Sequence, residues 1–137
     1  CYEELIIQKV DLKGTILKPN MILPGSSSNQ KISGEEIAEI TIKCLTESVP
    51  NEVPGIAFLS GGQSEVEATK NLNLINNKNK TNFIMTYSYG RALQQAALKH
   101  WSKNLQDIGG TQKIFNHRAK MCSLAAQGKW TEKVEKN

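Results

Sequence analysis

Apolar strand segments alternate with capped helices along this chain, and this alternation restricts the possible folds more than any other feature. Residues 55–59 form a continuously apolar run, as expected for a strand that is covered on both faces. Ser64 and Glu67 then have the spacing of a capping box, which opens a helix. Strands that alternate with helices form parallel sheets with right-handed crossovers. We therefore predict an α/β fold built on a parallel sheet.

The same pattern extends to both sides of this unit. A second capping box, formed by Ser33 and Glu36, opens an earlier helix. The remaining predicted elements are a helix end at 2–8, a strand at 83–89, a helix from 91, a break at Gly109–Gly110, a last helix that Gly128 stops, and a mobile polar end at 129–137. No internal repeat beyond the strand–helix unit and no second domain are visible.

The helix after Ser33 carries apolar side chains at helical spacing until it ends near Ser48. This spacing predicts one buried face, made of Ile37, Ile40, Thr41, Cys44 and Leu45. Cys122 lies on a similar stripe of the last helix, so we expect Cys44 and Cys122 in the core. Three widely spaced cysteines without a C-x-x-C pair indicate reduced thiols in an intracellular protein.

Residues 10–21 are predicted as one strand that ends in a lysine. Side chains alternate along a strand, so Gly14, Ile16 and Lys18 would share one face. Pro19 keeps Lys18 extended and then stops the strand, because proline has no N–H to donate. The carboxyl ends of parallel strands are where active sites lie in α/β proteins. A partly desolvated lysine there can lose its proton and attack a carbonyl. The alternative is a solvated lysine at a strand end.

The next two strands also end in residues suited to a ligand. Ser60, Gly61 and a further glycine follow the strand at 55–59, and Gly90 and Arg91 follow the strand at 83–89. Glycine backbones and helix N-termini bind anions through free N–H groups, and arginine pairs with phosphate as a forked cation. A lysine beside a phosphate site would act on a phosphorylated carbonyl compound. Each feature alone could instead be a tight turn or a surface residue.

Composition narrows the function classes. The 137 residues carry a net charge of +4 and suffice for one domain. The lysines are scattered, which argues against nucleic-acid binding, and no apolar run approaches a membrane span. His100 and His117 lack metal-ligand spacing, so we expect no zinc site. No secretory signal or transit peptide is visible, and because the first residue is Cys1, the sequence could be an internal piece of a longer chain.

Three segments in order resemble the signature segments of class I fructose-bisphosphate aldolases. They are residues 17–21 (LKPNM), 58–65 (FLSGGQSE) and 88–93 (SYGRAL). Residues 49–50 (VP) and 71–73 (NLN) also fit the family, and the resemblance runs from Tyr2 to about Trp130. Three segments at matching spacing make the resemblance specific.

The resemblance implies a fold and an activity. Residues 1–137 would be the C-terminal part of a single barrel domain: the last three strand–helix units of a TIM (β/α)8 barrel plus a C-terminal helix. The family is a glycolytic lyase of the cytoplasm, usually a homotetramer. Without a metal or other cofactor, it cleaves fructose 1,6-bisphosphate into dihydroxyacetone phosphate and glyceraldehyde 3-phosphate. By position, Lys18 would form the Schiff base, and the substrate phosphate would bind to Ser60, Gly61, Gly90 and Arg91.

The sequence also departs from the family pattern. Three strands do not close a barrel, which typically needs about 250 residues, and the family's acid/base residues lie on earlier strands. The usual C-terminal tyrosine is absent, and Leu23 stands where a threonine is more usual. Two possibilities therefore remain: part of a working lyase, or a truncated, non-catalytic product that binds sugar phosphates or a protein partner. In either case the outer strands would expose unpaired edges, which predicts aggregation or loose packing of the isolated chain.

Overall fold

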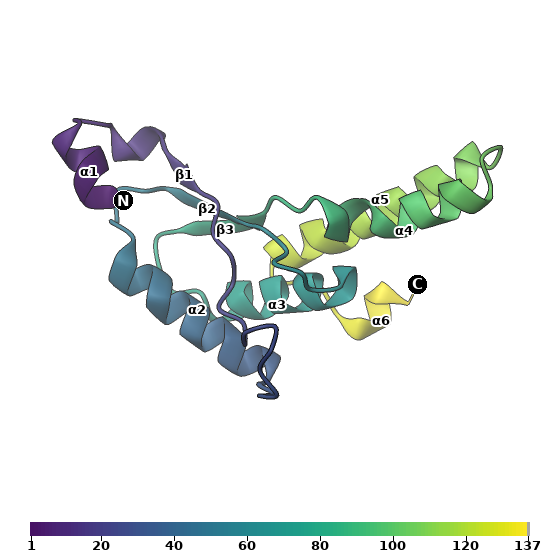
Figure 1. Cartoon of the computed structure of the whole chain (residues 1–137), viewed down its shortest axis with the longest axis horizontal. Helices are drawn as coiled ribbons and strands as arrows, with labels where there is room; N and C mark the ends of the chain where they lie inside the picture. Colours follow the sequence, from purple (N-terminus) through teal and green to yellow (C-terminus); the bar gives the residue numbers. More distant parts are fainter. Residues whose placement is uncertain (137) are drawn as a thin grey trace.

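A parallel three-stranded sheet forms the centre of the molecule (Figure 1). The computed structural model describes residues 1–136. The strands are β1 (Ile16–Leu17), β2 (Gly55–Phe58) and β3 (Ile84–Tyr87), in the order β1-β2-β3. All pairs are parallel, with Ile16 opposite Gly55 and Gly55 opposite Ile84. The predicted α/β class and strand order are confirmed.

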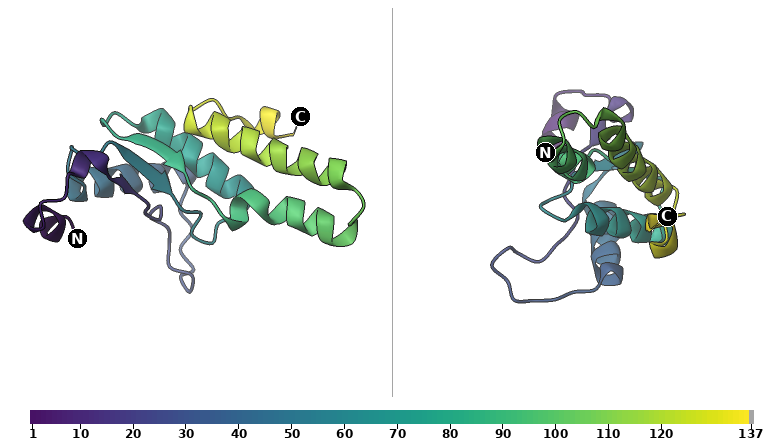
Figure 2. Two further views of the ribbon diagram at one scale, coloured as in Figure 1. Left: turned by 90° about the horizontal axis from the view of Figure 1, so that it is seen from above. Right: turned by 90° about the vertical axis from the view of Figure 1, so that its right-hand side faces the viewer.

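Helices connect the strands and continue the chain beyond them. They are α1 (Tyr2–Ile7), the 3₁₀ helix η1 (Leu12–Gly14), α2 (Gly34–Ser48), α3 (Glu65–Lys78), α4 (Arg91–Lys103), α5 (Ile108–Ala126) and α6 (Glu132–Glu135). Helices α2 and α3 pack side by side on one side of the sheet, whereas α4 and α5 form a long hairpin that points away from it (Figures 1 and 2). No helix among residues 1–136 combines the length and apolar character that crossing a membrane requires.

Both predicted capping boxes are present. The Ser33 hydroxyl accepts a hydrogen bond from the backbone N–H of Glu36, whose carboxylate accepts one from the N–H of Ser33. Ser64 and Glu67 make the same pair of bonds at the start of α3. Hydrogen bonds from the backbone and the hydroxyl of Ser33 lower the pKa of Glu36. The helix starts after β1 and β2 are thus set locally by the sequence.

The two faces of the sheet have opposite environments. Ile56 and Phe58 are fully buried under the helices, and Met85 is 2% exposed. On the other face, Ile16 is 70% exposed and Ile84 is 73% exposed. These two isoleucines flank Gly55 in the sheet register. We call the two sides the covered face and the open face.

The predicted strand at 10–21 is wrong in its first half. Residues Leu12–Gly14 form a 3₁₀ turn, and β1 begins only at Ile16. The Asp11 side chain accepts a hydrogen bond from the backbone N–H of Lys13, and the side chain of Leu12 is buried. An aspartate that bonds its own backbone favours such a turn over a strand. Gly14 therefore does not extend the strand face that Ile16 begins.

Two helical predictions also require correction. The buried face of α2 consists of Ile37, Ala38, Thr41 and Leu45, whereas Ile40 and Cys44 are exposed. Cys122 is buried, as expected. Gly109 and Gly110 do not break the chain but lie in the first turn of α5, where the Asp107 side chain accepts a hydrogen bond from the N–H of Gly110. The break comes before that cap, after Lys103.

The chain after α5 is packed against the body, not mobile. Gly128 has a φ of 67° just after the end of α5, as expected for a helix stop. Trp130 is buried, and its indole N–H donates to the carboxylate of Glu135 at 2.7 Å. The Arg118 guanidinium, itself buried, forms two hydrogen bonds with that same carboxylate. The predicted mobile end is therefore wrong for residues 129–136, and Asn137 lies outside the described residues.

Candidate active site

The carboxyl ends of the three strands lie at one edge of the sheet, as predicted. Hydrogen bonding continues just beyond the regular strands: the N–H of Leu59 donates to the carbonyl of Pro19 at 3.0 Å, and the N–H of Ser88 donates to the carbonyl of Phe58 at 2.8 Å. These bonds keep the three segments adjacent as they leave the sheet. Lys18, the turn that starts at Ser60 and the start of α4 therefore emerge side by side.

Lys18 follows β1 directly and, by strand alternation, projects from the open face together with Ile16. Its side chain is exposed. The partial desolvation expected for this lysine is therefore not provided by residues 1–136. It would require a neighbour on the open face.

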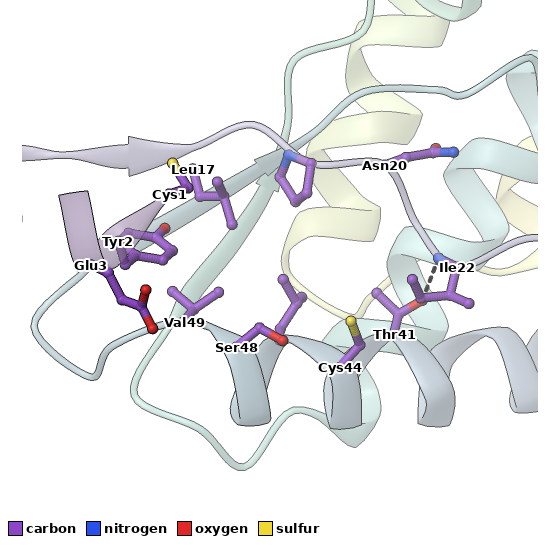
Figure 3. Close-up of a pocket in the computed structure, with 12 residues that line it drawn as sticks. Cys1, Tyr2, Glu3, Leu17, Asn20, Ile22, Thr41, Cys44, Ser48 and Val49 are labelled. Carbon is purple, nitrogen blue, oxygen red and sulfur yellow. Dashed lines mark hydrogen bonds between the residues drawn. The ribbon is translucent and has the colours of Figure 1, made fainter. Parts of the chain in front are cut away.

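The backbone after Lys18 is held by α2. The N–H of Ile22 donates to the hydroxyl of Thr41, a buried residue of α2, at 3.0 Å (Figure 3). A cavity of about 560 Å³ lies on this helix side, where Leu17 and Pro19 contribute to its lining. Since Leu17 faces this cavity, the neighbouring Lys18 side chain is directed to the opposite face. The anchor thus fixes the strand end without covering the lysine.

A tight turn follows β2. Gly61 and Gly62 have φ values of 58° and 84°, and the N–H of Gln63 donates to the carbonyl of Ser60 at 3.1 Å. Two central residues with positive φ are typical of a type I′ turn, which strongly favours glycine. A Cβ at Gly61 would also overlap the side-chain oxygen of Asn20. The positive φ therefore favours glycine at this position, and any larger residue would also have to displace the Asn20 side chain.

Side chains brace this turn from behind. The Gln63 carboxamide donates to the carbonyl of Ser60 at 2.9 Å, and Asn71 donates to the Gln63 side-chain oxygen at 2.7 Å. Asn71 lies on α3 and is 7% exposed. A cavity of about 610 Å³ is lined by Gly61, Gln63 and Asn71 among others. The sequence patterns did not single out Gln63 or Asn71, although both residues lie in the segments that resemble the family.

The turn after β3 is anchored to the same helix. Tyr89 is buried, and its hydroxyl donates to the carbonyl of Ala68 in α3 at 2.8 Å. Burial raises the pKa of Tyr89, so the hydroxyl stays protonated and can donate. Gly90 is the N-cap of α4 and Arg91 is its first residue; both are exposed. Helix α3 therefore positions both turns, one through Ala68 and the other through Asn71.

This arrangement suits an anion beside a primary amine. The N–H groups of Gly61 and Gly62 make no hydrogen bond within residues 1–136, and the first N–H groups of α4 are free in any helix start. Arg91 adds a cation next to them. No cluster of three or more histidine, cysteine, aspartate or glutamate residues suited to a metal ion occurs in the described part of the chain. The roles of Lys18, Ser60, Gly61, Gly90 and Arg91 remain predictions.

Comparisons with known proteins agree with the resemblance. The family model for class-I fructose-bisphosphate aldolase matches residues 1–137. Fructose-bisphosphate aldolase 4, cytosolic, from Arabidopsis thaliana is 50% identical over 129 residues, which cover 93% of this chain and 33% of that protein. Fructose-bisphosphate aldolase C from Rattus norvegicus is 48% identical over 130 residues, covering 94% of this chain and 36% of that protein.

A solved structure agrees as well. The fructose-bisphosphate aldolase from Plasmodium falciparum, crystallised with TRAP and a small-molecule inhibitor, matches with a TM-score of 0.90 at 38% identity. The match covers 95% of this chain and 38% of that one. The chain thus spans about a third of the length of the relatives it matches, and its sheet is a partial barrel. It belongs to the class I fructose-bisphosphate aldolase family.

Proposed function

We propose that this chain supplies the nucleophile and a phosphate site of a class I aldolase that cleaves fructose 1,6-bisphosphate. The main observation that supports this proposal is that Lys18 emerges at the same edge of the sheet as the glycine turn after β2 and the start of α4. Residues 1–137 would be the C-terminal part of a single barrel domain. In that barrel the open face points inward, and the remaining strands desolvate Lys18.

Lys18 would act through covalent catalysis. The neutral amine attacks the ketone carbon of the substrate, the carbonyl oxygen leaves as water, and a protonated imine forms. When the carbon–carbon bond breaks, the imine takes up the electron pair and the aldehyde product departs. The resulting enamine takes up a proton on carbon and becomes an imine again, and water then hydrolyses this imine to release dihydroxyacetone phosphate and the free lysine. The acid/base groups for these proton transfers would come from the rest of the barrel.

The phosphate would bind between the two turns. The hydroxyl of Ser60 and the N–H groups of Gly61 and Gly90 would donate to phosphate oxygens, and Arg91 would pair with the charge. Such a site would hold the substrate with its carbonyl next to Lys18. The attack then becomes an effectively unimolecular step, which lowers its entropic cost.

Cleavage of fructose 1,6-bisphosphate by the protein isolated from its source, with a chelator present throughout, tests this proposal. We expect both triose phosphates to form and the chelator to have no effect. Loss of activity in chelator would indicate a metal-dependent mechanism. The intact mass of the same sample tests the alternative: a mass of about 15.2 kDa, with sugar-phosphate binding and no cleavage, would indicate a non-catalytic product.

We further propose a cytoplasmic homotetramer. Cytosolic and cytoplasmic isozymes among the relatives support the location, and the family resemblance supports the assembly. Light scattering on the purified protein would measure the assembly directly, and a monomer at micromolar concentration would contradict it.

A further inference from the structure

Gln63 and Asn71 form a polar relay behind the glycine turn. The Ser60 carbonyl accepts two hydrogen bonds, one from the backbone N–H of Gln63 at 3.1 Å and one from its side chain at 2.9 Å. The first bond is part of the turn itself. The second comes from a carboxamide whose own oxygen is held by Asn71 at 2.7 Å. The relay therefore links α3 to the peptide group between Ser60 and Gly61.

The orientation of that peptide group decides where the Gly61 N–H points. In a trans peptide the C=O and N–H groups point in opposite directions. Because Gln63 holds the Ser60 carbonyl on its own side, the Gly61 N–H points away from Gln63. Without the carboxamide, a turn of two glycines could rotate this peptide at little cost, since glycine populates many backbone conformations.

The burial of the relay supports a positioning role. Asn71 is 7% exposed, so its amide needs a partner, and Gln63 is that partner. The Gln63 carboxamide also lies 3.5 Å from the sulfur of Met21, a fully buried residue three positions after Lys18. The relay thus contacts the chain on both sides of the proposed site.

We infer that Gln63, oriented by Asn71, is a positioning residue that presets the Ser60–Gly61 peptide for a phosphate ligand. The inference rests on the proposed function, because it assumes that phosphate binds at this turn. It adds that the affinity of the turn depends on side chains that touch no ligand. Asn71 acts only through Gln63, so the two residues form one functional unit.

Calorimetric titration of the protein with dihydroxyacetone phosphate, compared with dihydroxyacetone, tests the inference. Gln63→Ala should weaken binding of the phosphorylated ligand roughly 3- to 10-fold, the loss expected from one hydrogen bond. Binding of the ligand without phosphate should not change. With the bisphosphate substrate, KM should rise more than kcat falls. Asn71→Ala should have a similar effect alone and no added effect in the Gln63→Ala background.

Asn76→Ala is the matched control. Asn76 lies on the same helix, and its amide donates to the carbonyls of Leu72 and Ala125, away from the turn. This variant should lower the thermal midpoint but leave the affinity for dihydroxyacetone phosphate unchanged. If Gln63→Ala does not fold, Gln63→Met keeps most of the side-chain volume and removes the donor.

The outcomes separate the two proposals. Normal affinity for dihydroxyacetone phosphate in Gln63→Ala or Gln63→Met, with an Arg91→Ala variant that binds poorly, would overturn the relay and leave the proposed function intact. Equally weakened binding of both ligands, or the same loss of affinity in Asn76→Ala, would show that the relay has only a structural role. Either result would also overturn the inference. No binding of dihydroxyacetone phosphate to the unmodified protein would overturn both.

Discussion

The covered and open faces of the sheet are made from the same strands but do different things. On the covered face, Ile56 and Phe58 have no exposed surface and pack under the helices. On the open face, Ile16 and Ile84 are mostly exposed, and Lys18 projects beside them. The covered face therefore supplies the stability of these residues. The open face carries Lys18, the nucleophile of the proposed reaction.

The difference shows how one alternating pattern can encode two requirements. Successive side chains of a strand point to opposite faces, so each strand contributes to the core and to the site at once. Exposed apolar side chains that gather on one sheet face, as Ile16 and Ile84 do on either side of Gly55, mark a surface that another element covers. The interior of a barrel is such a surface, which agrees with the match to aldolases over about a third of their length.

The largest effect is expected on the covered face. Phe58→Ala should lower the free energy of unfolding by about 3–5 kcal/mol, because it removes a fully buried ring and leaves a cavity. Chemical denaturation followed by circular dichroism measures this loss. A change below about 1 kcal/mol would show that Phe58 is less tightly packed than its zero exposure indicates.

The ion pair behind the covered face should make stability depend on pH. Burial would raise the pKa of Glu135, but hydrogen bonds from Arg118 and Trp130 outweigh it, and the pKa is lowered below 4.5. A carboxylate whose pKa is lower in the folded than in the unfolded protein stabilises the fold when the pH is above the unfolded-state pKa. This contribution is lost as the pH falls through the folded-state pKa. Glu135→Gln should cost about 1.5–3 kcal/mol at pH 7.

Denaturation of this variant and of the unmodified protein between pH 7 and pH 3 measures the effect. The difference between the two proteins should shrink as the pH falls below about 4.5. Glu52→Gln, at an exposed carboxylate outside the ion pair, is a matched change of the same type. An equal difference at all pH values for Glu135→Gln would mean that the pair does not control the acid sensitivity.

Arg91→Ala tests the ligand side of the comparison. The variant should weaken binding of dihydroxyacetone phosphate by about 1.5–3 kcal/mol, the range for hydrogen bonds to charged groups. The loss for dihydroxyacetone should be much smaller, and unfolding should be unaffected because Arg91 is exposed. Equal losses for both ligands, measured by titration calorimetry, would place Arg91 outside the phosphate site.

A much smaller effect on stability than that of Phe58→Ala is expected on the open face. Ile84→Thr in the 137-residue chain should change the free energy of unfolding by no more than about 0.5 kcal/mol, because the side chain is 73% exposed. It should, however, reduce self-association, which sedimentation would detect, because exposed apolar faces and strand edges promote aggregation. A sharp unfolding transition in a monomeric sample of the unmodified chain would contradict this expectation.

Local signals predicted most of the fold. The capping boxes at Ser33 and Ser64 act within three residues, and the apolar strand at 55–59 needs no distant partner to be recognised. Errors arose where a weaker local interaction competed with the pattern. Asp11 turned the expected strand into a 3₁₀ helix, and Asp107 capped a helix across two glycines.

The tertiary contacts could not be predicted from the sequence alone. Whether Cys44 is buried depends on which side of α2 faces the sheet. The helical spacing between Thr41 and Cys44 is compatible with either a buried or an exposed Cys44. The braces of the site join residues far apart in the chain: Asn71 is eight residues from Gln63, and Tyr89 is 21 residues from Ala68. Motif spacing identified Lys18 and Arg91 as candidates, but not the side chains that position the turns.

Imine trapping on the full-length protein tests directly whether Lys18 is the nucleophile. Dihydroxyacetone phosphate followed by borohydride should convert the imine to a stable amine, and peptide mapping should find the adduct on Lys18. Lys18→Met should abolish both adduct and cleavage, and in the 137-residue chain it should leave unfolding unchanged, because the side chain is exposed there. An adduct on Lys9 or Lys13, or cleavage without any adduct, would contradict the assignment.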